Sequence, residues 1–239
     1  GCAFFVLCVA SFLVWSGVSP GGGGVGSFSR VARCGGGWGR CGGGRVCERL
    51  DFNSAVAVKR FKSGSKDIGG YLAELAMSEF ISNNTEHCVH ALDAFHYKNQ
   101  NFIVFELHGQ SLHQVIQSTG NMDKHHALSI ARQLLLAIAE IHSFNIIHCD
   151  IKPANCLVHR SENQQEWVLK LCDYGLCESR GNNSDPKATG QMPMGPSFFI
   201  EVGTLPYRAI EVLLGDCSYS YPVDIWAAGS TFAEMLNSK

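Results

Sequence analysis

HCDIKPAN, at residues 148–155, follows the apolar pair Ile146-Ile147 and a long amphipathic segment, so it reads as a polar loop placed against a core. Within it, Asp150 and Asn155 are five residues apart, and a tight loop can aim both side chains at one site. A carboxylate there could orient a hydroxyl, and an amide oxygen could hold a metal ion. Each residue alone could equally be a turn former, so the interpretation depends on the other residues of the sequence.

Further charged residues lie at workable distances on both sides of this loop. Asp173-Tyr174-Gly175 follows a strand-like run and offers a second carboxylate before a glycine that permits a sharp turn of the backbone. Upstream, Lys59 lies in an expected strand and Glu74 in an expected helix. A lysine buried beside a sheet needs a counter-charge, so Glu74 is the expected partner. Taken singly, each of these charges could be an ordinary solvated residue. Turn formers and surface charges have no reason, however, to occur together in the order lysine, glutamate, HCDIKPAN loop and DYG at these spacings.

Length and composition exclude several classes of protein. The 239 residues suit one large domain or two small ones, and 46% hydrophobic against 17% charged residues excludes a wholly disordered or coiled-coil protein. With 19 Lys and Arg against 21 Asp and Glu, the net charge is -2. Binding of nucleic acid by neutralising many phosphates needs a basic surplus, so no nucleic-acid partner is expected.

Periodicity predicts an α+β protein whose strands and helices are largely segregated. Strands are expected at 55–61, 101–107, 156–158 and 168–172, and helices at 67–82, 123–143 (with Asp123 as N-cap) and 222–236. Residues 178–197 are rich in Gly, Asn, Ser and Pro and are expected to form a long loop.

The N-terminal part differs from the rest of the sequence. Residues 1–19 are apolar or small and could be a membrane or secretory element, whereas the glycine-rich run 21–44 resembles a linker. We expect 1–44 to be an extension that is disordered or not native, and membrane association is left open. The 11 cysteines include no CxxC pair, which gives no support to a zinc site and favours a reducing compartment.

With these features in order, residues 46–239 resemble the catalytic domain of eukaryotic protein kinases. The matching motifs are VAVK ending at Lys59, Glu74, HCDIKPAN, DYG at 173–175, and Ala209-Ile210-Glu211 in place of APE. Within the kinases the sequence is similar to the CMGC group, on the residues YRAIEVLLG at 207–215. Cys149 in place of the usual arginine resembles the DYRK family, and FELHGQSL at 105–112 is similar to both DYRK and LAMMER kinases.

The resemblance implies a bilobal fold. An N-lobe of a β-sheet plus one helix would cover 45–108, with a hinge at 106–109 and Phe105 at the back of the adenine pocket. A helical C-lobe would cover 109–239. Because related kinases have several more helices after the one containing Asp224, this lobe is expected to be incomplete and the kinase domain to be truncated at its C-terminal end.

The resemblance also implies ATP and Mg²⁺ as cofactors and assigns a role to each site residue. Asp150 would be the catalytic base, Lys152 would contact the γ-phosphate, and Thr204 would steady the loop. Asn155 and Asp173 would hold Mg²⁺. Further ATP contacts would come from the lysine and its glutamate, the hinge and a glycine loop; these residues are Lys59, Glu74, Glu106, Leu107, Gly37, Gly39 and Gly42.

The implied activity is that of a protein serine/threonine kinase acting on a Ser or Thr protein substrate, with dual specificity left open. The alternative is a pseudokinase, a nucleotide-binding or scaffold module, since the glycine loop at 37–42 is a poor match. No cyclin partner is indicated, and an intracellular location, nuclear or cytoplasmic, is expected.

His148 is interpreted as structural. Because Cys149 replaces the arginine that pairs with a loop phosphate in many kinases, activity is expected to depend little on loop phosphorylation.

Overall fold

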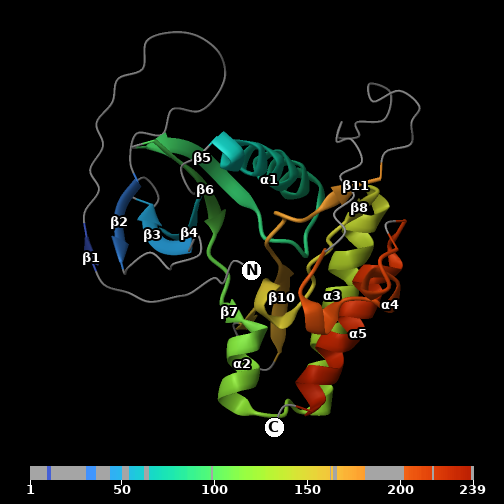
Figure 1. The fold of residues 1–239 in the computed structure, drawn as a ribbon. Coiled ribbons are helices and arrows are strands. Elements are labelled where there is room, and N and C mark those ends of the chain that lie inside the picture. Colours follow the sequence, from blue (N-terminus) through green and yellow to red (C-terminus); the bar gives the residue numbers. More distant parts are fainter. Residues whose placement is uncertain are drawn as a thin grey trace. The chain divides into compact units, whose positions relative to one another are not determined.

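The computed structural model describes residues 10–11, 31–35, 44–49, 54–61, 65–97, 99–161, 163, 166–180, 202–216 and 218–237. The protein divides into two compact units. The first comprises Gly1–Leu75 and His90–Leu107, and the second comprises Ala76–Val89 and His108–Lys239. Figure 1 shows the helices and strands of both.

The first unit is built on an antiparallel six-stranded sheet of order β1-β2-β3-β4-β6-β5. Its strands are β1 (Ala10–Ser11), β2 (Val31–Gly35), β3 (Gly44–Arg49), β4 (Ser54–Arg60), β5 (Ala91–Tyr97) and β6 (Gln100–Glu106). Val56, Val58, Phe102 and Val104 form its apolar cluster. These residues alternate along β4 and β6 because successive side chains of a strand point to opposite faces.

Helix α1 (Ser65–Asn84) begins in the first unit and ends in the second. Its residues up to Leu75 belong with the sheet, and Met77 and Ile81 are buried in the second unit. The helix predicted at 67–82 is confirmed, and so are the strands predicted at 55–61 and 101–107, which are β4 and β6.

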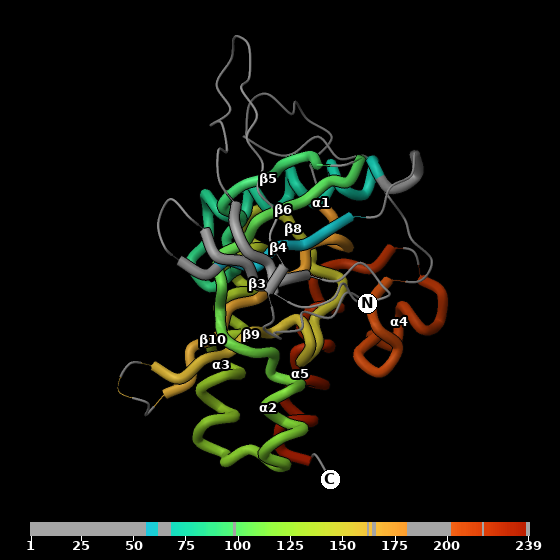
Figure 2. The backbone as a smooth tube through the Cα atoms, turned by 90° about the vertical axis from the view of Figure 1, so that its left-hand side faces the viewer, coloured from blue at the N-terminus to red at the C-terminus, as the bar shows by residue number. Residues whose placement is uncertain are grey.

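The second unit is mainly helical. Its helices are α2 (Leu112–Thr119), α3 (Lys124–Ser143), α4 (Ile210–Leu213) and α5 (Pro222–Asn237). Its short strands are β7 (Gln110–Ser111), β8 (Ile146–Ile147), β9 (Cys156–Arg160), β10 (Trp167–Leu171) and β11 (Glu178–Ser179). α3 and α5 lie side by side, as both backbone views show (Figures 1 and 2).

Local chemistry explains where the longest helix of this unit begins and which face it buries. The carboxylate of Asp123 accepts hydrogen bonds from the backbone N–H groups of His125 and His126, which confirms it as the N-cap of α3. α3 then buries a stripe at helical spacing, formed by Ala127, Ile130, Leu134, Ala137, Ile138 and Ile141. The helix predicted at 222–236 is confirmed as α5.

The predicted α+β class is confirmed. β5 and α2 were not among the predicted elements. Among the described residues, no helix is both long enough and apolar enough to cross a membrane. Most of the apolar stretch 1–19, the proposed glycine loop with Gly37, Gly39 and Gly42, and most of the predicted loop at 178–197 lie outside the described residues.

Candidate active site

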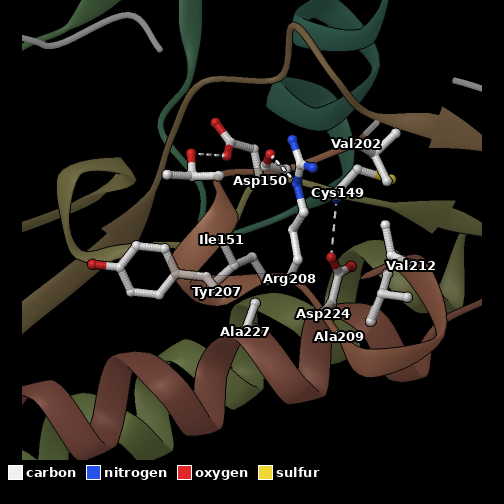
Figure 3. A pocket seen from close by; sticks show the side chains of 13 residues that line it. Cys149, Asp150, Ile151, Val202, Tyr207, Arg208, Ala209, Val212, Asp224 and Ala227 are labelled. Carbon is white, nitrogen blue, oxygen red and sulfur yellow. Dashed lines mark hydrogen bonds between the residues drawn. The ribbon is translucent and has the colours of Figure 1, made fainter. Parts of the chain in front are cut away.

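The loop 148–155 is fixed at its start by a buried carboxylate on α5. Asp224 is 1% exposed, and its oxygens accept the backbone N–H of His148 at 2.8 Å and of Cys149 at 3.0 Å. The same carboxylate accepts a hydrogen bond from Nε2 of His142, at the end of α3, at 2.8 Å. Figure 3 shows Asp224 rising from α5 to the backbone of Cys149. Three donors therefore satisfy this buried charge, and the loop is tied to two helices.

The backbone at Cys149 is unusual, with a φ of 64° that few residues other than glycine adopt. Its carbonyl oxygen approaches Gly203, whose φ is 77° and where an added Cβ would lie 2.8 Å from that oxygen. Arg208 donates from Nε to the Gly203 carbonyl at 2.9 Å and extends into the small pocket drawn in Figure 3. The segment around Gly203 is thus packed directly against the loop.

Asp150 sits at the centre of a buried hydrogen-bond cluster. Its Oδ2 accepts from Lys152 Nζ at 2.7 Å and from Asn155 Nδ2 at 3.1 Å, and its Oδ1 accepts from Thr204 Oγ1 at 2.8 Å. Lys152 Nζ also donates to Thr204 Oγ1 at 2.8 Å, which closes a ring of contacts. Asp150 and Lys152 are each 6% exposed, so this charge pair lies in a place that water barely reaches. A carboxylate offers about four lone-pair sites, so one on Oδ1 remains after these three donors.

Asn155 is fully buried, and the direction of its amide is set by two donated hydrogen bonds. Nδ2 donates to the Asp150 carbonyl at 2.8 Å and to the Asp150 carboxylate, whereas Oδ1 is buried with no hydrogen-bond partner among the described residues. A buried amide oxygen without a donor is costly unless something else binds it. Oxygen donors of this kind suit Mg²⁺, so the residue fits the metal that the resemblance implies.

Asp173 is brought close to Asn155 along the backbone. The carbonyl of Asn155 accepts the N–H of Cys172, the residue before Asp173, at 3.0 Å. Asp173 itself has a φ of 72°, in the left-handed region, where a short polar side chain is tolerated. The carboxylates of Asp150 and Asp173 and the amide of Asn155 therefore belong to one unit and to two adjoining loops.

His148 and Tyr174 are buried side chains that pack against each other beside these two loops. His148 is fully buried, accepts the Asp150 N–H at Nδ1 (3.3 Å) and contacts the Cys172 carbonyl through Nε2 (3.2 Å). The rings of His148 and Tyr174 meet edge to face at 6.1 Å. Every polar atom of the imidazole is engaged in holding backbone, which agrees with its interpretation as a structural residue.

In the first unit, Lys59 and Glu74 meet as the sequence predicts. Lys59 Nζ lies 2.5 Å from Glu74 Oε1, and the two side chains are 6% and 4% exposed. Lys59 pairs with Ile103 of β6 and Gly44 of β3, so the sheet holds the lysine on a central strand. Burial makes each charge depend on the other, because an unpaired charge in such a place is strongly unfavourable.

The expected hinge residues lie at the end of β6. Glu106 exchanges two hydrogen bonds with His90: its Oε1 accepts the His90 N–H, and its own N–H donates to the His90 carbonyl, both at 3.0 Å. Phe105 is buried, whereas Leu107 is 40% exposed. The Glu106 side chain and backbone N–H therefore hold His90, the residue before β5.

Of the predicted site residues, the structure gathers Asp150, Lys152, Asn155 and Thr204 in one cluster and Lys59 with Glu74 in another. The anchoring role of Asp224 was missed. Its signal in the sequence is an aspartate set among apolar residues of a helix, where a charge is out of place unless it serves buried donors.

Two comparisons with known proteins bear on this arrangement. Residues 36–239 match the protein kinase domain family. The sequence is also similar to the serine/threonine-protein kinase prpf4B of Dictyostelium discoideum, with 35% identity over 184 residues, which is 74% of this protein and 20% of that one. The match thus spans about a fifth of the length of this curated relative.

Proposed function

The protein belongs to the protein kinase domain family, and on that basis we propose that it transfers the γ-phosphoryl group of ATP to Ser or Thr hydroxyls of protein substrates. The observation that carries the proposal is the buried cluster around Asp150, in which both carboxylate oxygens are held and one lone-pair site is left. A residue whose only role is to form a turn has no need of three side-chain donors.

In the proposed reaction the substrate oxygen bonds to the γ-phosphorus, and the bond from that phosphorus to the bridging β,γ-oxygen breaks, so that ADP leaves. The hydroxyl proton passes to the free site on Oδ1 of Asp150 and then to solvent. Thr204 and Lys152 keep the carboxylate in one orientation. Such positioning of the reacting groups is a main contribution of the protein to phosphoryl transfer.

Lys152 has a second task in the proposal. Its ammonium is held by Asp150 and Thr204 at 2.7 and 2.8 Å, and a lysine Nζ has three protons to donate. The third proton is available to a phosphate oxygen. A positive charge at this place stabilises the negative charge of the transferred group.

Asn155 and Asp173 would hold Mg²⁺ through their side-chain oxygens. The strongest support for this site is Oδ1 of Asn155, which is buried without a hydrogen-bond partner among the described residues. Bound there, the ion would neutralise phosphate charge as it develops. In the first unit, Lys59 would bind phosphate oxygens of ATP while Glu74 orients its ammonium. The backbone of Glu106 and Leu107 and the glycine loop at Gly37, Gly39 and Gly42 complete the proposed nucleotide contacts.

The finer placement within the CMGC group, near the DYRK and LAMMER kinases, is also a proposal. It rests on the residues 207–215 and on Cys149, which takes the place of an arginine. With no guanidinium at 149 to pair with a loop phosphate, we propose that activity needs little loop phosphorylation. Phosphatase treatment should then leave the rate nearly unchanged. An intracellular location is proposed because Cys88, Cys149, Cys156 and Cys177 are buried free thiols.

The direct test is transfer of labelled γ-phosphate to a general Ser/Thr protein substrate with and without Mg²⁺, followed by phosphoamino-acid analysis. Lys59→Met should abolish transfer in a sample that circular dichroism shows to be folded, and labelled residues should be Ser or Thr. Transfer that persists at the wild-type rate in Lys59→Met would overturn the proposal. The pseudokinase alternative is not favoured, since a protein that only binds nucleotide or a partner has no need of both the Asp150 cluster and the Lys59–Glu74 pair.

A further inference from the structure

An aromatic pair lies beside the Lys59–Glu74 ion pair in the first unit. Phe61 directly follows β4, two residues after Lys59, so both side chains leave the strand on the same face. The ammonium of Lys59 lies 5.5 Å from the centroid of the Phe61 ring. The Phe61 ring in turn meets the ring of Tyr71 edge to face, at 5.1 Å and 69°.

The partners of both contacts lie on one face of α1. Tyr71 precedes Glu74 by three residues, and residues at this spacing are neighbours on a helix surface. The ion pair and the aromatic pair therefore join the same strand to the same helix at adjacent points. The backbone of Phe61 is itself fixed, because its N–H donates to the Asn101 carbonyl at 2.9 Å.

A second link of this kind matters because the ion pair is buried. Lys59 is 5% exposed and Glu74 4%, and a buried charge pair is favourable only when its geometry is well kept. One contact between a strand and a helix leaves the helix free to rotate about it, whereas two adjacent contacts do not. The face of the Phe61 ring also attracts the ammonium directly.

We propose that Phe61 and Tyr71 are positioning residues for Lys59. The pair sets the rotation of α1 against β4 and holds the ammonium of Lys59 at Glu74, ready for a phosphate oxygen. This inference rests on the proposed function, because it concerns the presentation of Lys59 to ATP.

The test is steady-state phosphoryl transfer by the whole protein with ATP and protein substrate varied separately. Phe61→Leu keeps an apolar side chain but removes the ring, and kcat/KM for ATP should fall about 3- to 10-fold while KM for the protein substrate stays unchanged. Tyr71→Leu should act in the same direction. The double variant should lose no more than the worse single variant, because both remove one shared contact. Phe61→Tyr, which keeps the ring, should restore kcat/KM for ATP.

A matched control exists on the same sheet. Phe95 of β5 stacks on Phe102 of β6 at 4.8 Å, and Phe102 packs with Val56 and Val58, which alternate with Lys59 along β4 and so lie on the opposite face of the sheet. Phe95→Leu should lower stability yet leave kcat/KM for ATP within about two-fold of wild type. Equal losses in Phe61→Leu and Phe95→Leu, or strictly additive losses in the double variant, would overturn the inference. A Lys59→Met variant as active as wild type would instead refute the proposed function itself.

Discussion

Tyr174 occupies the place where the kinase motif usually has phenylalanine, and its hydroxyl has a definite structural task. The residue is 2% exposed, and its Oη lies 2.7 Å from the Val89 carbonyl oxygen and 2.9 Å from the Leu171 carbonyl oxygen, so the single hydroxyl proton is shared between these two acceptors. Burial raises the pKa of Tyr174 well above its ordinary value, so the hydroxyl keeps its proton at any physiological pH. The two acceptors come from the segment after α1 and from the end of β10, which the hydroxyl ties to the Asp173 loop.

Tyr174→Phe keeps the ring and removes only this donor. The Leu171 carbonyl still accepts the Val89 N–H at 2.8 Å, but the Val89 carbonyl loses the hydroxyl that satisfies it. Leaving a buried acceptor unsatisfied costs about 1–3 kcal/mol. For a protein of this length the melting temperature should fall by about 2–4 °C for each kcal/mol, or about 2–12 °C in all.

The measurement is the free energy of unfolding from urea titration, supported by the melting temperature. Tyr221→Phe is the control, since Tyr221 donates to Asn145 Oδ1 at 2.9 Å but is only half-buried, so water can replace the lost bond. Its loss should stay below about 1 kcal/mol. A Tyr174→Phe variant as stable as wild type, or more stable, would refute the assignment of this hydroxyl as a buried tether.

Three further outcomes follow from the geometry. Gly203→Ala should destabilise by at least about 1–2 kcal/mol in the same titration, because φ is 77° and the new Cβ would lie 2.8 Å from the Cys149 carbonyl oxygen; an unchanged midpoint would contradict this. Partial burial alone would raise the pKa of Glu140, but hydrogen bonds from the backbone and ring of His87 and from the N–H of Glu86 outweigh it and hold that pKa below its ordinary 4.5. The stability advantage of wild type over Glu140→Gln should therefore be complete above pH 4.5 and shrink as the pH falls below it; an advantage that grows in acid would contradict the assignment. Burial raises the pKa of Cys88 and of Cys156 to about 12, so iodoacetamide at pH 8 should label neither until the protein is unfolded, as peptide mapping would reveal; labelling of the folded protein would contradict this.

The sequence predicts best the elements with strong local signals. α3 has an N-cap and an apolar stripe, and both are found at the predicted residues. β5 was missed because ALDAFHY lacks regular alternation, and its strand conformation depends on pairing with β6. α2 is only 8 residues long, yet Ser111 and Gln114 form a capping box that could have revealed it.

The contacts of the site also differ in how well the sequence predicts them. Lys59 and Glu74 could be paired in advance because a lysine in an apolar strand demands a counter-charge. The link from Asp224 to the His148 backbone joins residues 76 positions apart, and no local pattern encodes such a contact. The same holds for Thr204 and Asp150, 54 positions apart, whose contact was expected only through family resemblance.

The central claim is that the Asp150 carboxylate is needed for phosphoryl transfer and not for the binding of ATP. A single preparation of the Asp150→Asn variant tests it directly. Affinity for ATP with Mg²⁺, from calorimetry, and transfer of labelled γ-phosphate should be measured on the same sample beside wild type. We expect Kd within about three-fold of wild type and transfer reduced by about 10²- to 10⁴-fold, the contribution of a positioned general base. Transfer by Asp150→Asn at the wild-type rate, or a wild-type protein that binds ATP and transfers nothing, would contradict the account.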